Sequence, residues 1–351
     1  MPRDAETPGA AVGSPLAVRM DDVAERARVS RATVSRVLMG TARVSEATQV
    51  RVLDAMRELG YVPNTIAQGL AARRTDLVGL LLRDPRNPAY GLLHAEVQTE
   101  AARHGLQLIS VVPTPTEGVE DELAGLRRLL GLRVGGLMVS TGVIRAADLE
   151  PFLDAVPVVS VGRIEEHPGI YGVSYDEDTN AAIVAGRVAE AGHRSVAVII
   201  PDIRVSTAEN RRGLGMAADL EGRGLDVHRV EANSFGTNVD GYDDVVSLVR
   251  AGSITAALFP SDWRALGFLD RADAEGLRVP EDMSVTGIDG VMPGIERMGL
   301  TSLRIPVREV AVRGVEVLDR MVRDRGSVEI RHERFPGTFL PGRTLGAPPP
   351  H

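Results

Sequence analysis

One short segment of the chain, residues 30–36 (SRATVSR), gathers side chains that could read the edges of nucleic-acid bases. Its spacing is helical, with Val34 on the inner face and a serine placed to cap the first turn. An arginine guanidinium can bond guanine O6 and N7 bidentately, and hydroxyl groups suit phosphates or base edges. The residues predicted to contact DNA here are Ser30, Arg31, Ala32, Thr33, Ser35 and Arg36. The alternatives are a phosphate contact alone for Arg31 and a merely solvated position for either arginine.

A second group of polar and aromatic residues follows apolar runs later in the chain. Open parallel α/β sheets bind ligands beyond the carboxyl ends of their strands, so residues at those points are candidates for a small-molecule site. Charged side chains there can hydrogen-bond a polar ligand, and aromatic rings can stack on it. The candidates are Asp84, Tyr90, Arg163, Arg212, Trp263 and Asp289. The alternatives are a domain-bridging ion pair for Arg212 or Asp289 and simple packing for Trp263.

Other chemistries lack the residues that they need. The chain has no cysteine, which excludes disulfides, thiolate metal sites and cysteine nucleophiles. The seven histidines show no paired metal-binding spacing, and neither a phosphate-binding glycine loop nor a serine nucleophile elbow is present. We therefore predict that the protein has no metal, no cofactor and no enzymatic activity.

The charge of the chain is divided unevenly. The net charge is −8, yet residues 1–75 hold 11 arginines and 8 acidic residues, and the remainder holds 29 arginines and 40 acidic residues. All the basic residues are arginines, whose guanidinium fork suits phosphates and guanine edges. A small basic head on an acidic body is typical of a protein that binds nucleic acid.

The chain is predicted to be cytoplasmic and to have no membrane partner. No stretch approaches the 18 or so consecutive apolar residues of a membrane-spanning helix. The first 17 residues carry prolines and acids where a secretion signal has an apolar run, and their composition predicts a disordered tail.

The pattern of residues 18–63 predicts a three-helix head, which has the size of a helix-turn-helix unit. Ser30 and Ser45 can cap its second and third helices, and Gly60 can end the third. The apolar spacing predicts inward-facing side chains on the three helices in turn, namely Val23, Ala24 and Ala27; Val34, Val37 and Leu38; and Val50, Leu53 and Met56.

The rest of the chain alternates apolar runs with segments of helical length. The predicted strands are 77–82, 106–112, 135–140, 157–161, 196–200, 255–259 and 284–288. The predicted helices are 92–104, 119–130, 177–191, 209–222, 239–251 and 264–275. Apolar strands that alternate with helices indicate parallel sheets covered on both faces. Because there are seven or more such units, we expect two lobes.

Motifs along nearly the whole chain resemble one known family. In the head they are DVA (22–24), TVSRVL (33–38), LGYVPN (59–64) and AQGLA (67–71), and in the body NP (87–88), GR (162–163), AGH (191–193), RRGLG (211–215), GLRVPEDMSVTGID (276–289) and LTSLR (300–304). The order and spacing of these motifs resemble the lac-repressor family of bacterial transcription regulators.

The resemblance implies further DNA contacts and a hinge helix between the head and the body. It adds Tyr61, Asn64, Ala67 and Leu70 to the DNA-binding residues. Residues 64–75 then correspond to a hinge helix and linker, with Leu70 wedged between base steps of the minor groove. The sequence departs from the family at Arg28, where a turn glycine is usual, and at Gly162, where many relatives have an aspartate. The first change predicts a non-glycine residue at positive φ.

The resemblance also implies the fold and its division. We expect an α/β protein with an N-terminal helix-turn-helix head and a two-lobed, periplasmic-binding-protein-like body of parallel α/β sheets. The body is expected at residues 76–344, before a tail at 345–351. Its first lobe is expected at about 76–173 and 304–333, and its second at about 174–303 and 334–344.

The implied function is sequence-specific control of transcription. We expect a homodimeric repressor that binds a pseudo-palindromic double-stranded operator and responds to a small polar effector, a sugar or sugar derivative. Two alternatives are a cytosolic small-molecule sensor without operator function and an enzyme on the same scaffold. The intact segment 30–36 argues against the first, and the missing acid–base pairs argue against the second.

Overall fold

The computed structural model describes residues 18–39, 44–62, 75–113, 119–232 and 241–350. The chain forms two compact units, Met1–Thr75 and Asp76–His351, which we call the head and the body. No helix in the described ranges has the length and apolar composition to cross a membrane.

Three helices form the head: α1 (Met20–Ala27), α2 (Arg31–Met39) and α3 (Glu46–Leu59). Their core contains the predicted residues of α1 and α2, since Val23, Ala24, Ala27 and Val34 are buried and Val37 and Leu38 pack against them. The predicted positive φ of Arg28 is confirmed, because this residue ends α1 in the left-handed conformation with φ of 53°. Gly60 ends α3 in the same way, with φ of 66°.

The predicted inner face of α3 is wrong in part. Val50 and Leu53 are 51% and 47% exposed, whereas Val52 and Ala55 are buried and Met56 packs against the core. Helix α3 carries two apolar stripes, one through residues 50 and 53 and another through 52, 55, 56 and 59. Both have helical spacing, so the pattern alone does not decide which stripe meets α1 and α2.

The body contains two parallel sheets. The order of the larger sheet is β11-β5-β4-β3-β1-β2, and that of the smaller one is β7-β6-β8-β9. The larger sheet consists of β1 (Leu77–Leu82), β2 (Gln107–Val111), β3 (Leu137–Ser140), β4 (Val158–Val161), β5 (Tyr171–Tyr175) and β11 (His332–Phe335). The smaller sheet consists of β6 (Ser195–Pro201), β7 (Asp226–Ala232), β8 (Ala256–Leu258) and β9 (Ser284–Thr286). All seven predicted strands are therefore present, together with others that the sequence analysis does not name.

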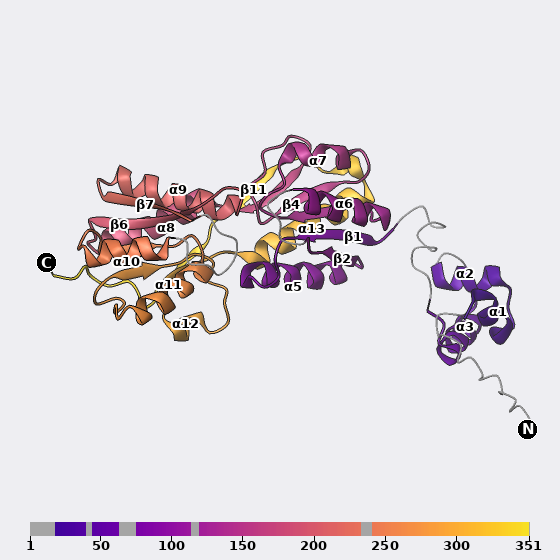
Figure 1. Cartoon of the computed structure of the whole chain (residues 1–351). Helices are drawn as coiled ribbons and strands as arrows, with labels where there is room; N and C mark the ends of the chain where they lie inside the picture. The colour runs from indigo at the N-terminus through magenta and orange to yellow at the C-terminus, as the bar shows by residue number, and fades with distance from the viewer. Residues whose placement is uncertain (1–17, 40–43, 63–74, 114–118, 233–240, 351) are drawn as a thin grey trace, which may run out of the picture. The chain divides into compact units, whose positions relative to one another are not determined.

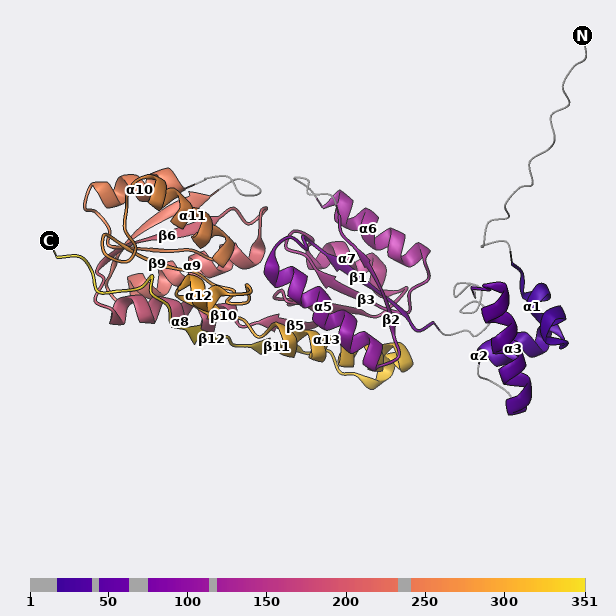
Figure 2. The same cartoon turned by 90° about the horizontal axis from the view of Figure 1, so that it is seen from below.

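Helices cover both faces of each sheet, as Figures 1 and 2 show. Around the larger sheet these are α5 (Pro88–Arg103), α6 (Glu120–Gly131), α7 (Ala146–Leu153) and α13 (Val307–Arg323). Around the smaller sheet they are α8 (Glu177–Glu190), α9 (Thr207–Gly222), α10 (Tyr242–Arg250), α11 (Asp262–Ala274) and α12 (Ile295–Met298). We call the two layered assemblies the first and the second lobe.

Alternation along the central strand shows how the first lobe buries both faces of its sheet. Leu80 and Leu82 of β1 belong to the core cluster that includes α5 and α13, whereas Leu81 belongs to the cluster that includes α6 and α7. Successive residues of a strand point to opposite faces, so a run such as LVGLLL requires helices on both.

The chain passes between the lobes more than once. It leaves the first lobe after β5, completes the second lobe, and returns through β10 (Ser302–Arg304) to α13 and β11. It then passes back to β12 (Thr338–Leu340), which pairs antiparallel with β10. These crossings place the ends of several strands from both lobes around one region of the body.

Candidate functional site

Helix α2 presents the predicted base-contacting side chains, Arg31 in its first turn and Arg36 in its last. Arg31, Ala32 and Arg36 are exposed, whereas Thr33 and Ser35 are half-buried. Ser30 caps the helix, because its Oγ accepts a hydrogen bond from the Thr33 backbone N–H at 3.1 Å. The structure thus places all six predicted residues on α2 or at its cap.

The two arginines of α2 have only weak partners within the head. Arg31 lies 3.6 Å from Asp21, and the side chains of both are more than 60% exposed. The Arg36 Nε donates to the Ala32 carbonyl at 3.1 Å, and its Nη2 lies 3.4 Å from Thr33 Oγ1. Exposed interactions of this kind contribute little to stability, so both guanidinium groups are available to a partner.

The other predicted DNA contacts divide into two groups. Tyr61 follows Gly60 at the end of α3, is half-buried and packs against the core of the head. Asn64, Ala67 and Leu70 lie outside the described residues, as does most of the predicted hinge.

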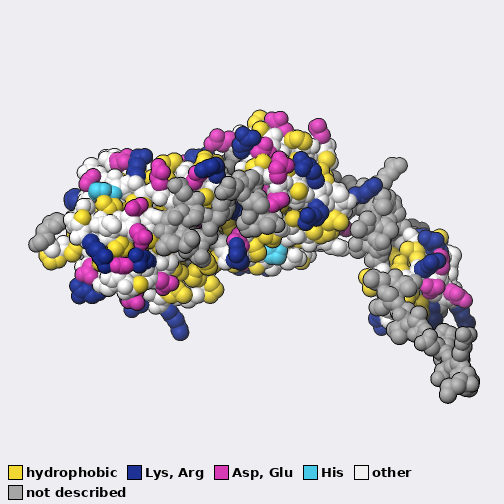
Figure 3. Space-filling view, viewed as in Figure 1, with side chains coloured by type: hydrophobic (Ala, Val, Ile, Leu, Met, Phe, Trp, Pro, Cys, Tyr) yellow, Lys and Arg dark blue, Asp and Glu magenta, His cyan; other side chains and the backbone are white. Residues whose placement is uncertain are grey.

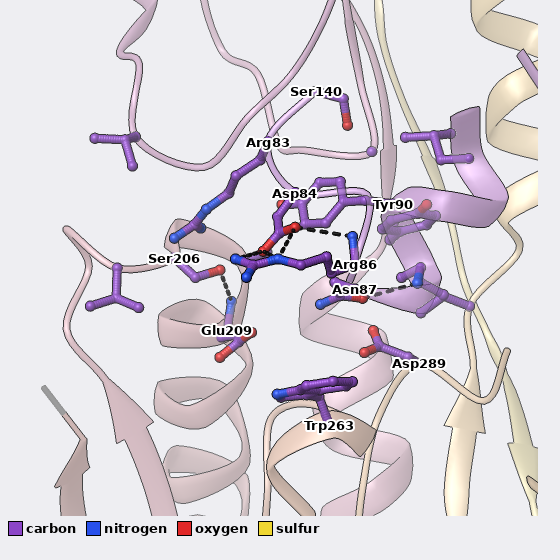
Figure 4. A pocket seen from close by; sticks show the side chains of 18 of the residues that line it. Arg83, Asp84, Arg86, Asn87, Tyr90, Ser140, Ser206, Glu209, Trp263 and Asp289 are labelled. Atoms are coloured by element: carbon purple, nitrogen blue, oxygen red, sulfur yellow. Dashed lines mark hydrogen bonds and ion pairs between the residues drawn. The ribbon is translucent and has the colours of Figure 1, made fainter. Parts of the chain in front are cut away.

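A cavity of about 610 Å³ lies in the body, with residues of both lobes around it. Five of the six predicted effector-binding residues line it, namely Asp84, Tyr90, Arg212, Trp263 and Asp289. Figure 4 shows the paired side chains of Asp84 and Arg86, from the first lobe, opposite the ring of Trp263, from the second. The strand-end rule therefore locates one shared site.

Arg163, the sixth candidate, does not line the cavity, although its neighbour Gly162 does. Its Nη1 donates to the Ile144 carbonyl at 2.5 Å, and its Nη2 lies 3.4 Å from Glu165. Burial lowers the pKa of this guanidinium, although the nearby carboxylates of Glu165 and Glu122 act to raise it. In this structure Arg163 joins two loops of the first lobe behind the cavity.

Arg212 is at the centre of a buried ion cluster in the second lobe. Arg212 lies in the second turn of α9, and its guanidinium forms a bidentate pair with Glu177 of α8, at 2.7 and 3.0 Å. Its Nη1 also donates to Asp289 at 2.9 Å and to the Pro260 carbonyl at 3.0 Å. All three charged side chains are less than 10% exposed. Arg212 and Asp289 thus form an ion pair, but within the second lobe and not between the lobes as the domain-bridging alternative requires, and both also line the cavity.

Asp289 has an unusual backbone and an unusual environment. Its φ is 137°, a conformation that costs a non-glycine residue about 1–3 kcal/mol and that occurs mainly at functional sites. Burial raises the pKa of its carboxyl to about 8, against the opposing attraction of Arg212, and the nearby charge of Asp262 adds to the rise. Asp262 itself accepts hydrogen bonds from Gly290 N–H at 2.6 Å and Ser302 Oγ at 2.5 Å.

The structure adds charged residues that the sequence analysis did not name. Glu209 of α9 pairs with Arg264 of α11 at 2.6 Å, and both line the cavity. Glu122 of α6 also lines it, and burial raises the pKa of this carboxyl. Glu177 could have been found by the strand-end rule, because it follows β5 by two residues. That strand is missing from the prediction.

The two aromatic candidates differ in exposure. The Trp263 side chain lies at the start of α11 and is 42% exposed on the cavity wall, whereas Tyr90 is half-buried in the first turn of α5. A tryptophan that remains this exposed beside a cavity presents a ring face on which a ligand can stack. Pure packing therefore does not account for Trp263.

We expect the pH dependence of stability to report the ionisation of Asp289. Its pKa in the folded chain lies above that of an unfolded aspartate, so its contribution to stability falls as the pH rises through about 8. The groups that face it are Arg212, Glu209, Asp262, Tyr90 and Tyr175. Asp289→Asn keeps the shape and cannot titrate. The melting temperature of the unmodified chain should therefore fall relative to that of the variant between about pH 4 and 8 and level off above that, and parallel curves would contradict the assignment.

Comparison with known families gives two matches. Residues 19–64 match the model of bacterial regulatory proteins of the lacI family, and residues 185–345 match a periplasmic binding protein-like domain. Among curated proteins, the HTH-type transcriptional regulator AscG of Escherichia coli (strain K12) is 30% identical over 313 residues, which cover 86% of this chain and 90% of AscG.

Solved structures resemble the chain over most of its length. A lac repressor dimer bound to operator and the anti-inducer ONPF has a TM-score of 0.81 at 24% identity, covering 94% of this chain and 99% of that one. A complex of the transcriptional regulator CelR with cellobiose has a TM-score of 0.64 at 26% identity, and the match covers 93% of this chain and 99% of the CelR chain. The first similarity shows the expected fold: a helix-turn-helix head and a two-lobed body.

Proposed function

Because this chain belongs to the lacI family of bacterial regulatory proteins, and so is a DNA-binding transcription regulator, we propose that it is a cytoplasmic repressor. In this proposal it binds a pseudo-palindromic operator as a homodimer and responds to a small polar effector, a sugar or sugar derivative. It acts by binding and not by catalysis.

The observation that carries the proposal is the exposed end of α2. Its arginines are accessible and weakly paired, while Val34 of the same helix is fully buried in the head. A helix held in this way can insert its first turn into the major groove without rearranging the core of the head. The direct base contacts are assigned to Arg31, Ala32 and Arg36, with Ser30, Thr33 and Ser35 beside them.

The effector is assigned to the cavity of the body. Residues from both lobes line it, so a bound ligand would bias how the lobes close. In this proposal residues 64–75 act as a hinge whose pairing in the dimer the effector weakens or strengthens. The cellobiose complex of CelR and the operator complex of the lac repressor support a sugar-like effector and a dimer.

The first experiment is selection of the operator by DNA affinity, followed by binding measurements at several salt concentrations. Each phosphate neutralised contributes a slope of about −0.9 to the logarithmic salt dependence. We expect a steep slope in spite of the net charge of −8, because the head concentrates the DNA-facing arginines. A salt-insensitive interaction, or tightest binding of one chain to a single half-site, would contradict the proposal.

A further inference from the structure

The arginines around the cavity of the body already have partners. Arg212 uses Glu177, Asp289 and the Pro260 carbonyl, Arg264 uses Glu209, and Arg86 forms a two-pronged pair with Asp84 at 2.9 and 3.0 Å. Arg83 is also engaged. Each cationic side chain of the wall therefore already has a partner in the free protein, although Arg264 keeps N–H groups beyond the one that binds Glu209.

Two carboxylates of the same wall are less saturated. Asp289 uses Oδ1 to bind Arg212, and Glu209 uses Oε2 to bind Arg264. Among the described residues, no hydrogen bond reaches Asp289 Oδ2 or Glu209 Oε1. Figure 4 shows these two carboxylates on either side of the Trp263 ring. The open positions of this wall thus include two carboxylate oxygens that can accept hydrogen bonds, next to an exposed aromatic face.

The residues that line the cavity are balanced in formal charge, but in the second lobe two further acidic side chains lie behind the wall. Glu209 and Asp289 line the cavity together with Arg212 and Arg264, whereas Glu177 and Asp262 are buried and do not line it. Burying unpaired carboxylates is costly, and a group in this position shifts its pKa or takes up a cation. The raised pKa of Asp289 agrees with this reading, because the free protein then holds a proton where a positive charge is missing.

The outer surface gives no comparable preference on the face that Figure 3 shows, where basic and acidic side chains are interspersed over the body. The cavity wall combines open carboxylate oxygens, arginines that already have partners and an aromatic ring face, and this combination suits a cation.

We propose that the effector carries a positively charged amine, which binds the open oxygens of Asp289 and Glu209 and lies against the face of Trp263. This inference rests on the proposed function, since it concerns the same effector site. It narrows the effector from polar compounds in general to amines, such as an amino sugar or another small organic ammonium compound.

The test uses matched probes that differ in the amine alone. The pairs are D-glucosamine and D-glucose, D-galactosamine and D-galactose, and benzylamine and benzyl alcohol. Trp263 is the only tryptophan of the chain, so its emission in the full-length protein reports binding at this wall. We expect at least one amine to change the emission at a concentration about tenfold or more below that needed for its neutral counterpart. The reason is that hydrogen bonds to a charged group are stronger than those between neutral groups.

Three variants identify the residues responsible. Asp289→Asn and, independently, Glu209→Gln should each reduce the preference for the amine, so the test survives if one variant folds poorly. Asp282→Asn is the control, because Asp282 pairs with Arg278 at 2.6 Å and does not line the cavity. It removes one negative charge and should leave the preference unchanged.

The inference is overturned if neutral probes act at equal or lower concentrations than amines, or if no amine changes the emission. It is also overturned if the preference persists in both Asp289→Asn and Glu209→Gln. Operator binding measured in the same samples separates this failure from failure of the proposed function. A neutral compound that alters both emission and operator binding would leave the function standing, whereas a chain that binds no operator would refute the function itself.

Discussion

Replacing Arg212 by methionine is expected to destabilise the body by about 3–5 kcal/mol, the usual cost of removing one partner from a buried ion pair. Methionine fills much of the space of the arginine stem but leaves Glu177 without its two hydrogen bonds and Asp289 without its one. Both carboxylates would remain less than 10% exposed. The loss should appear in urea unfolding followed by the emission of Trp263.

A second substitution separates the charge from the packing. If the uncompensated carboxylate of Glu177 causes the loss, then adding Glu177→Gln to Arg212→Met should restore a substantial part of the stability, so the two effects should not add. Arg211→Met is the matched control, because Arg211 neighbours Arg212 on α9 but pairs with Asp178 at the surface, where both side chains are more than a third exposed. A loss below about 1 kcal/mol in Arg212→Met, or full additivity in the double variant, would contradict this account of the cluster.

The same cluster shows what the sequence could and could not predict. Arg212 and Asp289 were found because each follows a strand that is apolar enough to recognise, VAVII before the first and SVTGI before the second. Their shared partner Glu177 follows β5, whose sequence YGVSY alternates too weakly to stand out as a strand. The sequence could therefore predict the positions in the cavity wall but not that Arg212 would already be neutralised there.

The missed strands lie mostly at sheet edges and carry polar residues. Edge strands β7 (DVHRVEA) and β11 (HERF) expose one side to solvent, so they lack the continuous apolar runs of β1 or β6. The interior strands β1, β3, β4, β6 and β8 are apolar on both faces and could be predicted, although interior strand β5 was missed and the apolar edge strands β2 and β9 were found. The position of β11 depends on a chain crossing between lobes, and local patterns do not encode such a crossing.

In the head, local sequence signals predict the elements themselves, but the packing of one helix could not be predicted. The helices of the head, the Ser30 cap, the Gly60 helix end and the left-handed Arg28 could be predicted from local signals, because caps and turns depend on a few neighbouring residues. Ser45 precedes α3 as predicted, but its side chain makes no cap hydrogen bond. The choice between the two apolar stripes of α3 could not be predicted, because it depends on contacts with α1 and α2. Val50 and Leu53 are exposed although their spacing is as helical as that of Val52 and Ala55.

Replacing Arg36 by alanine is expected to reduce the affinity for the selected operator by about 5- to 150-fold, since one bidentate base contact is worth about 1–3 kcal/mol. Arg36→Lys should recover little of this loss, because a lysine keeps the charge without the two-pronged geometry. Arg57→Ala is the matched control, because Arg57 is an exposed arginine of α3 that pairs with Asp54. Fluorescence anisotropy with the operator and with unrelated DNA of the same length would measure both affinities.

The comparison of the two DNAs decides what Arg36 does. In the free protein its guanidinium lies along its own helix, bonded to the Ala32 carbonyl and close to Thr33. Releasing these exposed contacts costs little, so most of the energy of a base contact remains available for binding. A guanine contact is made on the operator alone, whereas a phosphate contact is made on any DNA. An equal loss on operator and unrelated DNA would therefore reassign Arg36 to the phosphate backbone, and base reading would have to rest on Arg31 and Ala32.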